Sequence, residues 1–429
     1  MTRPINFKSK HPAVLGKGEP VIRSVSGIKA QLFQWGLARS DLLFAVLRSI
    51  APILVLKNTA VVTRYDDVKE VFLADEAFAV PYAEKLNVIM GGVPFFLGMG
   101  DTEEYRRDTA AMRKAVPIED VAERLVPAAE AAAERAVARA NGKIEVVGEL
   151  FREVTFEVLL DYFGTPLPPA GDLYVWASRI FEFQFADASN DPALRKDVDI
   201  YAPALRNYIQ DLIEDRRSSG EERDDVLGRC LDAQAKHEDG FSDDKIRCAL
   251  VAFIGGGMPQ LPMLGPNALE QLLRRPKMLA EAQVAARNDD DGKLVKLAGY
   301  VFEAMRFDPL GPGLMRTLTK PYTLAAGTSR AKELPKDMAV FVSFASAMRD
   351  GRRVRDPEAF IPGRPPCNYI HFGHGLHECF GININRGLLP AILKPLLKRH
   401  DLTRTPGAEG YLRKQGVFAD RLVVRYQPA

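Results

Sequence analysis

Residues 369–381, YIHFGHGLHECFG, constrain this chain more than any other segment. They contain three of its six histidines, and glycines lie on both sides of Cys379. Two functional arrangements are compatible with these residues. In the first, the three histidines and Cys379 ligate zinc, because all four are zinc donors. In the second, a glycine-rich turn presents the thiolate of Cys379 ahead of a helix from Phe380 onward, whose N-terminal dipole favours the anion.

Most of the remaining chain is patterned for helices. Helix-forming composition or apolar residues at helical spacing predict helices over residues 119–141, 149–163, 171–185, 201–218, 225–236 and 242–275. Strand-like runs are few and short, over residues 61–63, 322–324, 340–343 and 421–426. We therefore predict a mainly α fold with a small β portion. Because no shift in composition marks a boundary, we expect a single domain over residues 1–429.

The charge balance argues against several classes of protein. The chain has 58 basic and 56 acidic residues and a net charge of +2, whereas a nucleic-acid binder carries a basic surplus. Its most apolar stretch, residues 42–56, is interrupted by Arg48 and Pro52, and it is too short to span a membrane. We expect this stretch to be buried. With no apolar region typical of a secretory signal near residue 1, we predict a cytoplasmic protein. We also expect it to be a monomer.

The spacing of the cysteine segment resembles the haem-ligand loop of the cytochrome P-450 family. The pattern F-G-x-G-x-H-x-C-x-G is matched by Phe372, Gly373, Gly375, His377, Cys379 and Gly381. The resemblance implies the cytochrome P-450 fold and a haem b cofactor whose iron is ligated by the thiolate of Cys379. It also implies that Phe372, Gly373, His377 and Gly381 contribute to the cofactor site.

Other segments match the same family in the expected order. Glu303-Ala-Met-Arg306 resembles its E-x-x-R pair, and Arg364 resembles the third member of that structural network. Arg316 lies where the family often places a partner of a haem propionate. A His and an Arg four residues apart commonly serve the same purpose, but here those two positions hold Tyr105 and Thr109. We expect Tyr105 to contact the cofactor, and Arg113, Arg106 or Arg107 to replace the missing cation.

The predicted central helix departs from the family pattern. Monooxygenases of the family usually carry [AG]-G-x-[DE]-T there, and the acid and alcohol help deliver protons to oxygen. Residues 253–263 read FIGGGMPQLPM, and no Ser or Thr occurs between Ser242 and Thr317. Gly256 leaves space beside the cofactor, and Gln260 is the nearest polar side chain. We predict that both residues take part in the reaction.

The predicted substrate lining is apolar. In the family the roof comes from segments that correspond here to residues 80–99 and 181–189, and further residues come from the central helix and the last turn. The candidate lining residues are Phe95, Phe96, Phe183, Phe253 and Val417. Such a lining indicates a hydrophobic small molecule: a lipid, terpene, steroid or aromatic compound.

The leading function that the resemblance implies is a monooxygenase supplied with electrons by a separate ferredoxin and ferredoxin reductase. The first alternative is a reductant-independent peroxygenase or fatty-acid hydroperoxide isomerase on the same haem. Residues 302–316 and 369–381 also resemble the haem-thiolate domain of fungal dioxygenase-fused hydroperoxide isomerases. The second alternative is a haem-binding sensor or assembly protein with little turnover.

Overall fold

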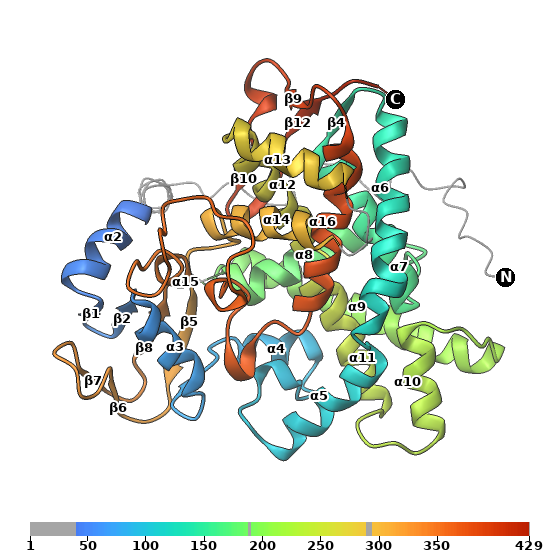
Figure 1. The fold of residues 1–429 in the computed structure, drawn as a ribbon. Helices are drawn as coiled ribbons and strands as arrows, with labels where there is room; N and C mark the ends of the chain where they lie inside the picture. The colour runs from blue at the N-terminus through green and yellow to red at the C-terminus, as the bar shows by residue number, and fades with distance from the viewer. Residues whose placement is uncertain (1–39, 188–189, 289–293, 429) are drawn as a thin grey trace.

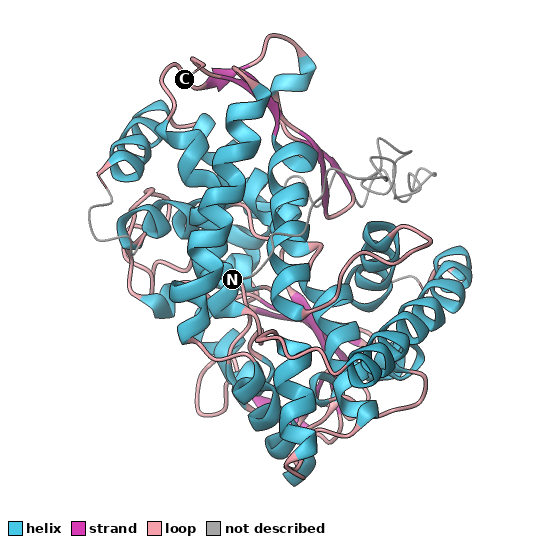
Figure 2. Ribbon diagram, turned by 90° about the vertical axis from the view of Figure 1, so that its right-hand side faces the viewer, coloured by secondary structure: helices cyan, strands magenta, loops and turns pink. Residues whose placement is uncertain are grey.

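The structure of the protein is a computed structural model that describes residues 40–187, 190–288 and 294–428. Helices form most of this part of the chain, and strands make up only small sheets beside them (Figure 1, Figure 2). The predicted mainly α fold with a small β portion is therefore confirmed. The N-terminal residues examined for a secretory signal lie outside the described residues, as do residues 188–189 of the predicted roof.

Helices account for most of the residues that the structure describes. The α-helices are α2 (Ser40–Ile50), α3 (Tyr65–Leu73), α4 (Ala83–Met90), α5 (Glu103–Ala115), α6 (Val126–Ala140), α7 (Glu153–Phe163), α8 (Leu173–Phe181), α9 (Pro192–Ser219), α10 (Val226–Ala235), α11 (Asp243–Ala252), α12 (Gln260–Leu273), α13 (Pro276–Arg287), α14 (Val295–Phe307), α15 (Phe344–Ala347) and α16 (Ile382–Lys398). Short 3-10 or π segments are η1 (Phe96–Gly98), η2 (Val121–Leu125), η3 (Val146–Arg152), η4 (Glu182–Ala186), η5 (Phe253–Gly257), η6 (Pro366–Asn368), η7 (Gly375–His377) and η8 (Ala408–Gly410).

The strands form one five-stranded sheet and three smaller ones. They are β1 (Ile53–Leu56), β2 (Thr59–Val62), β3 (Phe78–Ala79), β4 (Lys143–Glu145), β5 (Leu314–Leu318), β6 (Tyr322–Leu324), β7 (Lys332–Leu334), β8 (Ala339–Val342), β9 (Thr403–Arg404), β10 (Arg413–Gln415), β11 (Phe418–Arg421) and β12 (Val423–Arg425). The largest sheet has the order β1-β2-β8-β5-β3, in which β2 and β8 are parallel and the other pairs antiparallel. The smaller sheets are β4-β12-β9, β6-β7 and β10-β11.

Each predicted helical segment contains a helix. The segment predicted to begin at residue 201 begins earlier, at Pro192, because Pro192 occupies the first turn and the side chain of Asp191 accepts a hydrogen bond from the Ala193 N–H. Several strands were missed, including β5, which carries Arg316. Short strands give too few alternating residues for their periodicity to be recognised.

The core is built around a long central helical stretch. Apolar residues such as Ile246, Ile254 and Leu272 are buried along α11, η5 and α12, and α12 packs against α14 and α16. In the part of the chain that the structure describes, this stretch, Asp243–Leu273, is long and apolar enough to cross a membrane, but 72% of its apolar 18-residue window is buried inside the protein. A buried core helix has the same length and composition, so this finding does not indicate a membrane span.

The prediction that residues 42–56 are buried was wrong for much of the segment. Phe44 is buried and stacks on Phe341, with ring centroids 6.2 Å apart. The opposite face of α2 exposes four large apolar side chains, and β1 exposes two more: Leu42, Leu43, Val46, Ile50, Val55 and Leu56. α2 lies at the edge of the five-stranded sheet (Figure 1), where only one of its faces meets other described residues.

Candidate active site

The segment around Cys379 forms a closed loop ahead of α16. The N–H of Cys379 donates a hydrogen bond to the carbonyl oxygen of Phe372 (2.9 Å), and the N–H of Ile382 donates to that of Cys379 (3.1 Å). The helix begins at Ile382, with Gly381 as its N-cap residue. Cys379 therefore lies immediately before a helix N-terminus, as its position in the sequence predicts.

Two glycines make this loop possible. Gly373 and Gly375 have φ values of +82° and +73°, a region that side-chain-bearing residues rarely adopt. A Cβ on Gly375 would lie 2.8 Å from the carbonyl oxygen of Phe72 in α3, which packs against η7. Any larger residue at 375 would push the loop away from α3.

Burial dominates the electrostatics of the Cys379 thiol. It raises the pKa of Cys379 to about 11, although the Gly381 N–H bonded to the sulfur and the positive charge of Arg113 act in the opposite direction. A thiol in this environment stays protonated at neutral pH unless a stronger positive charge reaches the sulfur. A coordinated metal ion supplies such a charge and deprotonates the thiol.

A buried ionic network fixes the chain that leads to the loop. Glu303 accepts hydrogen bonds from Arg306 Nη2 (2.8 Å), Arg306 Nε (3.0 Å) and Arg364 Nε (3.1 Å). The Glu303 and Arg306 side chains are fully buried. Arg306 also donates to the backbone carbonyls of Met348, Pro357 and Ala359. The structure thus brings together all three residues of the predicted network.

Two cationic or titratable side chains close to the loop lack the partners that buried groups normally have. Arg316 in β5 is 3% exposed, and within the described ranges its side chain donates a hydrogen bond to the carbonyl oxygen of Met315 alone. Among the described residues it has no carboxylate partner. Burial, and next the charge of Arg316, lowers the pKa of His377 to about 4, and the buried His377 Nδ1 has no hydrogen-bond partner. The region between them therefore favours an anion.

The candidates on α5 have different surroundings. The Tyr105 hydroxyl donates to the carbonyl oxygen of Leu376 (2.6 Å), and its ring lies edge-on to His377. Arg113 Nη1 donates to the carbonyl oxygen of Phe380 (2.9 Å). Arg106 and Arg107 instead bond to acidic residues of their own segment, Asp101 and Asp108. Of the three arginines, Arg113 is the one that contacts the Cys379 loop.

The central helix opens beside this loop. A Cβ on Gly256 or Gly257 would meet nothing within 4 Å, whereas one on Gly255 would lie 2.8 Å from Ile180 Cγ2. These glycines lie in the π segment η5, and such segments occur frequently at functional sites. Gln260 Nε2 donates to the carbonyl oxygen of Gly256 (2.6 Å), four residues earlier.

The predicted lining residues form two groups. Phe96 and Phe253 both pack against Phe380, with ring centroids 5.6 Å apart in each pair, and Phe95 packs against Phe96. Val417 belongs to a separate apolar cluster made by Phe181, Met263 and Phe418. Phe183 is buried, and its ring lies 5.0 Å from Lys85 Nζ.

Comparison with known proteins identifies the family to which the chain belongs. The family model "Cytochrome P-450" matches residues 181–415, more than half of the chain. The chain belongs to the cytochrome P-450 family. The structure of CYP109E1 from Bacillus megaterium in complex with testosterone superposes with a TM-score of 0.72 at 21% identity, covering 90% of this chain and 99% of that one. The cytochrome P-450 fold is therefore confirmed.

Two relatives differ in their chemistry. Cyclomarin C epoxidase of Salinispora arenicola is 28% identical over 280 residues, which cover 63% of this chain and 67% of the epoxidase. A bifunctional dioxygenase–epoxy alcohol synthase of Fusarium oxysporum is 27% identical over 389 residues. That match covers 82% of this chain but 30% of the larger bifunctional protein.

Cytochromes P-450 bind haem b, and the residues around Cys379 fit this cofactor. Arg316 and His377 lack an anion, which the propionates of haem provide. Gly256 and Gly257 leave space for a planar ring where side chains would fill it. Cys379 offers a sulfur ligand. Burial raises the pKa of its thiol, and a bound metal ion would supply the positive charge that ionises it. By contrast, no group of three or more histidines, cysteines or acids could hold a metal ion in the described ranges, so the zinc arrangement is not formed.

Tyr82 was not singled out from the sequence. Burial raises the pKa of Tyr82, and the positive charge of Arg316 opposes this shift. Cys379 and Tyr105 raise the pKa further. Its ring packs edge-on against Phe185, with centroids 5.3 Å apart. Tyr82 therefore contacts the predicted roof at Phe185 and lies within electrostatic range of Arg316 and Cys379. The only signal in the sequence is its place at the start of the apolar loop that follows Phe78.

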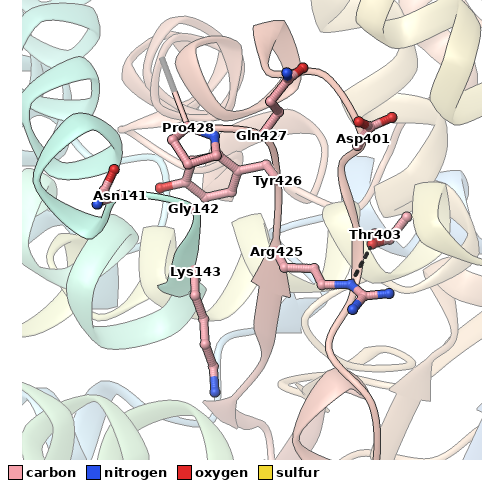
Figure 3. A pocket seen from close by; sticks show the side chains of 9 residues that line it. All are labelled: Asn141, Gly142, Lys143, Asp401, Thr403, Arg425, Tyr426, Gln427 and Pro428. Atoms are coloured by element: carbon pink, nitrogen blue, oxygen red, sulfur yellow. Dashed lines mark hydrogen bonds between the residues drawn. The ribbon is translucent and has the colours of Figure 1, made fainter.

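A pocket of about 640 Å³ lies elsewhere, beside the β4-β12-β9 sheet (Figure 3). Its lining includes Lys143, Asp401 and Arg425, and the Nε of Arg425 donates to Thr403 Oγ1 (3.2 Å). Lys143 is already paired with Glu409 at 2.9 Å. The lining shares no residue with the Cys379 loop or the central helix, so it does not extend the candidate active site.

Proposed function

We propose that this cytochrome P-450 is a monooxygenase that oxidises a hydrophobic small molecule and that Cys379 ligates its haem iron. One observation carries the proposal. Cys379 lies in a closed loop in which the Gly381 N–H acts on its sulfur, and the same loop carries His377, whose pKa is lowered by the buried Arg316, a cation with no carboxylate partner among the described residues. Haem iron held by a thiolate supplies the oxidising chemistry, which the protein itself does not perform.

The protein residues have separate roles in this proposal. Arg316 and His377 hold the propionates, because each has an unsatisfied donor or charge in a buried setting. Tyr105 holds the loop through the Leu376 carbonyl oxygen. Gly256 gives the substrate and cofactor space beside the central helix. The buried aromatic residues exclude water and favour a lipid, terpene, steroid or aromatic substrate.

A monooxygenase of this kind also needs proteins that supply it with electrons. The relatives include an epoxidase, and we propose that electrons reach this chain from a ferredoxin and its reductase in the cytoplasm.

A second candidate function is favoured by the central helix. The stretch FIGGGMPQLPM has no acid or hydroxyl side chain to relay protons. A substrate that already contains an O–O bond needs neither a reductant nor that relay. Because Gln260 Nε2 is engaged by Gly256, its Oε1 is left to accept a hydrogen bond from the O–H of such a hydroperoxide. The epoxy alcohol synthase relative supports this candidate.

One experiment separates the two candidates. The haem-loaded protein is given a fatty-acid hydroperoxide without oxygen or reductant, with Cys379→Ala as the control. Rapid Cys379-dependent conversion to one product would show hydroperoxide chemistry and make it the leading function in place of the monooxygenase. No conversion, together with product formation when oxygen, ferredoxin and its reductase are added with a hydrophobic substrate, would support the monooxygenase.

Gln260→Ala is the informative variant in the same assay. If Gln260 orients a hydroperoxide, we expect about a tenfold or greater loss of hydroperoxide conversion, the cost of one lost hydrogen bond of roughly 1.5 kcal/mol. Unchanged conversion would remove Gln260 from the mechanism. Inactivity of the wild-type protein in every arm, with haem fully bound, would favour the alternative of a haem-binding sensor or assembly protein.

A further inference from the structure

One peptide group links the surface of α5 to the Cys379 sulfur. Gly381 lies against the sulfur, since a Cβ added to it would be 3.9 Å from Cys379 Sγ, and its backbone N–H acts on the thiol as a hydrogen-bond donor that lowers the pKa. The carbonyl oxygen of the same peptide unit belongs to Phe380, and it accepts a hydrogen bond from Arg113 Nη1 (2.9 Å). The Arg113 guanidinium also lies over the Phe380 ring, 3.9 Å from its centroid. The two ends of this peptide dipole therefore face a cation and a sulfur atom.

This arrangement strengthens the hydrogen bond to sulfur. A cation at the carbonyl oxygen draws electron density from the amide and makes its N–H a better donor, because hydrogen bonds in series polarise one another. Hydrogen bonds to a ligating sulfur are among the features that tune the potential of the metal it binds. Arg113 thus acts on the sulfur through a covalent group without contacting it.

Asn385 holds the other side of the same glycine. Its Nδ2 donates to the carbonyl oxygen of Gly381 (2.9 Å), and its backbone N–H donates to the same oxygen (3.0 Å). Asn385 is 7% exposed, so water does not compete strongly for this bond. With Arg113 on one peptide unit and Asn385 on the next, the Gly381 N–H is fixed toward Cys379.

We propose that Arg113 is a positioning residue that raises the reduction potential of the haem iron through the Phe380–Gly381 peptide group. The inference rests on the proposed ligation of iron by Cys379. Electron density withdrawn from the thiolate favours the reduced iron, which carries one positive charge fewer. This role differs from the propionate contact expected for Arg113 from the sequence.

The test is the midpoint potential of the haem-loaded protein, measured by spectroelectrochemistry. We expect Arg113→Gln to shift the iron equilibrium about tenfold toward the oxidised form, which is ~59 mV for a one-electron couple. Arg113→Lys retains the charge and should restore part of the shift. Lys114→Gln is the matched control, since Lys114 is the next residue on α5, has a 62% exposed side chain and pairs with Glu238.

The outcomes separate this inference from the proposed function. A potential in Arg113→Gln equal to that of wild type, or moved no further than in Lys114→Gln, would overturn the role of Arg113. The carbon monoxide complex of the reduced wild-type protein reports the ligand independently. If its Soret band lacks the red shift that marks a thiolate, the ligation by Cys379 fails, whatever the potentials show.

Discussion

Glu303 is the residue whose replacement tests the structural basis of the site most directly. Its carboxylate accepts hydrogen bonds from two buried arginines, Arg306 and Arg364, and further ones from the Ile361 N–H (2.9 Å) and the Tyr369 hydroxyl (3.2 Å). Glu303→Gln preserves the shape but removes the charge. Both guanidinium groups then remain buried with no carboxylate to neutralise them.

The magnitude follows from burial. Breaking a buried ion pair by neutralising one partner costs about 3–5 kcal/mol. The entropy of unfolding is roughly 2.1 cal/mol/K per residue, or about 0.9 kcal/mol/K for 429 residues. We therefore expect Glu303→Gln to lower the Tm by about 3–6 °C. Because Arg306 and Arg364 fix the chain that leads to Cys379, we also expect less haem to be retained per protein.

The measurement is thermal unfolding followed by circular dichroism, with haem content determined on the same samples. The matched control is Glu153→Gln, since Glu153 pairs with Arg139 at 2.7 Å on the surface, where the two side chains are 33% and 58% exposed. An exposed pair contributes about 1 kcal/mol or less, so the control should shift the Tm by about 1 °C or less. Equal Tm shifts in the two variants would refute the reasoning.

Two further predictions concern single residues. Arg316→Met removes a buried cation without a carboxylate partner, so we expect the haem-free protein to unfold at a higher temperature while haem affinity falls; a lower Tm in the haem-free variant would contradict this. Burial, and next the charge of Arg386, lowers the pKa of His371 to about 3 from 6.5, so the unfolded chain binds the proton first as pH falls. The free energy of unfolding should therefore decrease between pH 6.5 and about 3, by at most ~1.4 kcal/mol per pH unit from this group, and urea titrations should show a shallower pH dependence in His371→Phe.

The sequence identified the Cys379 loop and the Glu303–Arg306 pair through the family motifs that they resemble, and the residues of each motif are close together in the chain. The glycines before Cys379 are only a few residues away from it in the sequence. The backbone of the loop needs positive φ values at two of them, Gly373 and Gly375. Glu303 and Arg306 are likewise one helical turn apart. Local spacing is readable without knowing how helices pack.

The contacts that surround these groups depend on packing and were harder to predict from the sequence. Residues 106, 107 and 113 are all arginines of α5, and their spacing alone did not show which of them faces the Cys379 loop. The structure selects Arg113, because the last turn of α5 lies against Phe380. Residues 42–56 show the converse problem. Their apolar composition is the same whether a face meets the core or solvent, so composition did not predict the exposed side of α2.

The central helix combines both kinds of information and limits the chemistry most strongly. The lack of an acid or hydroxyl side chain over residues 253–263 is visible in the sequence and holds for any packing. The hydrogen bond from Gln260 to the Gly256 carbonyl oxygen is visible only in the structure. Together they mean that a side-chain proton relay cannot be restored by a rotamer change, since the nearest amide is already committed to the helix. With the proposed function, we expect protons to come from water or from the substrate itself, and the hydroperoxide assay distinguishes these two sources.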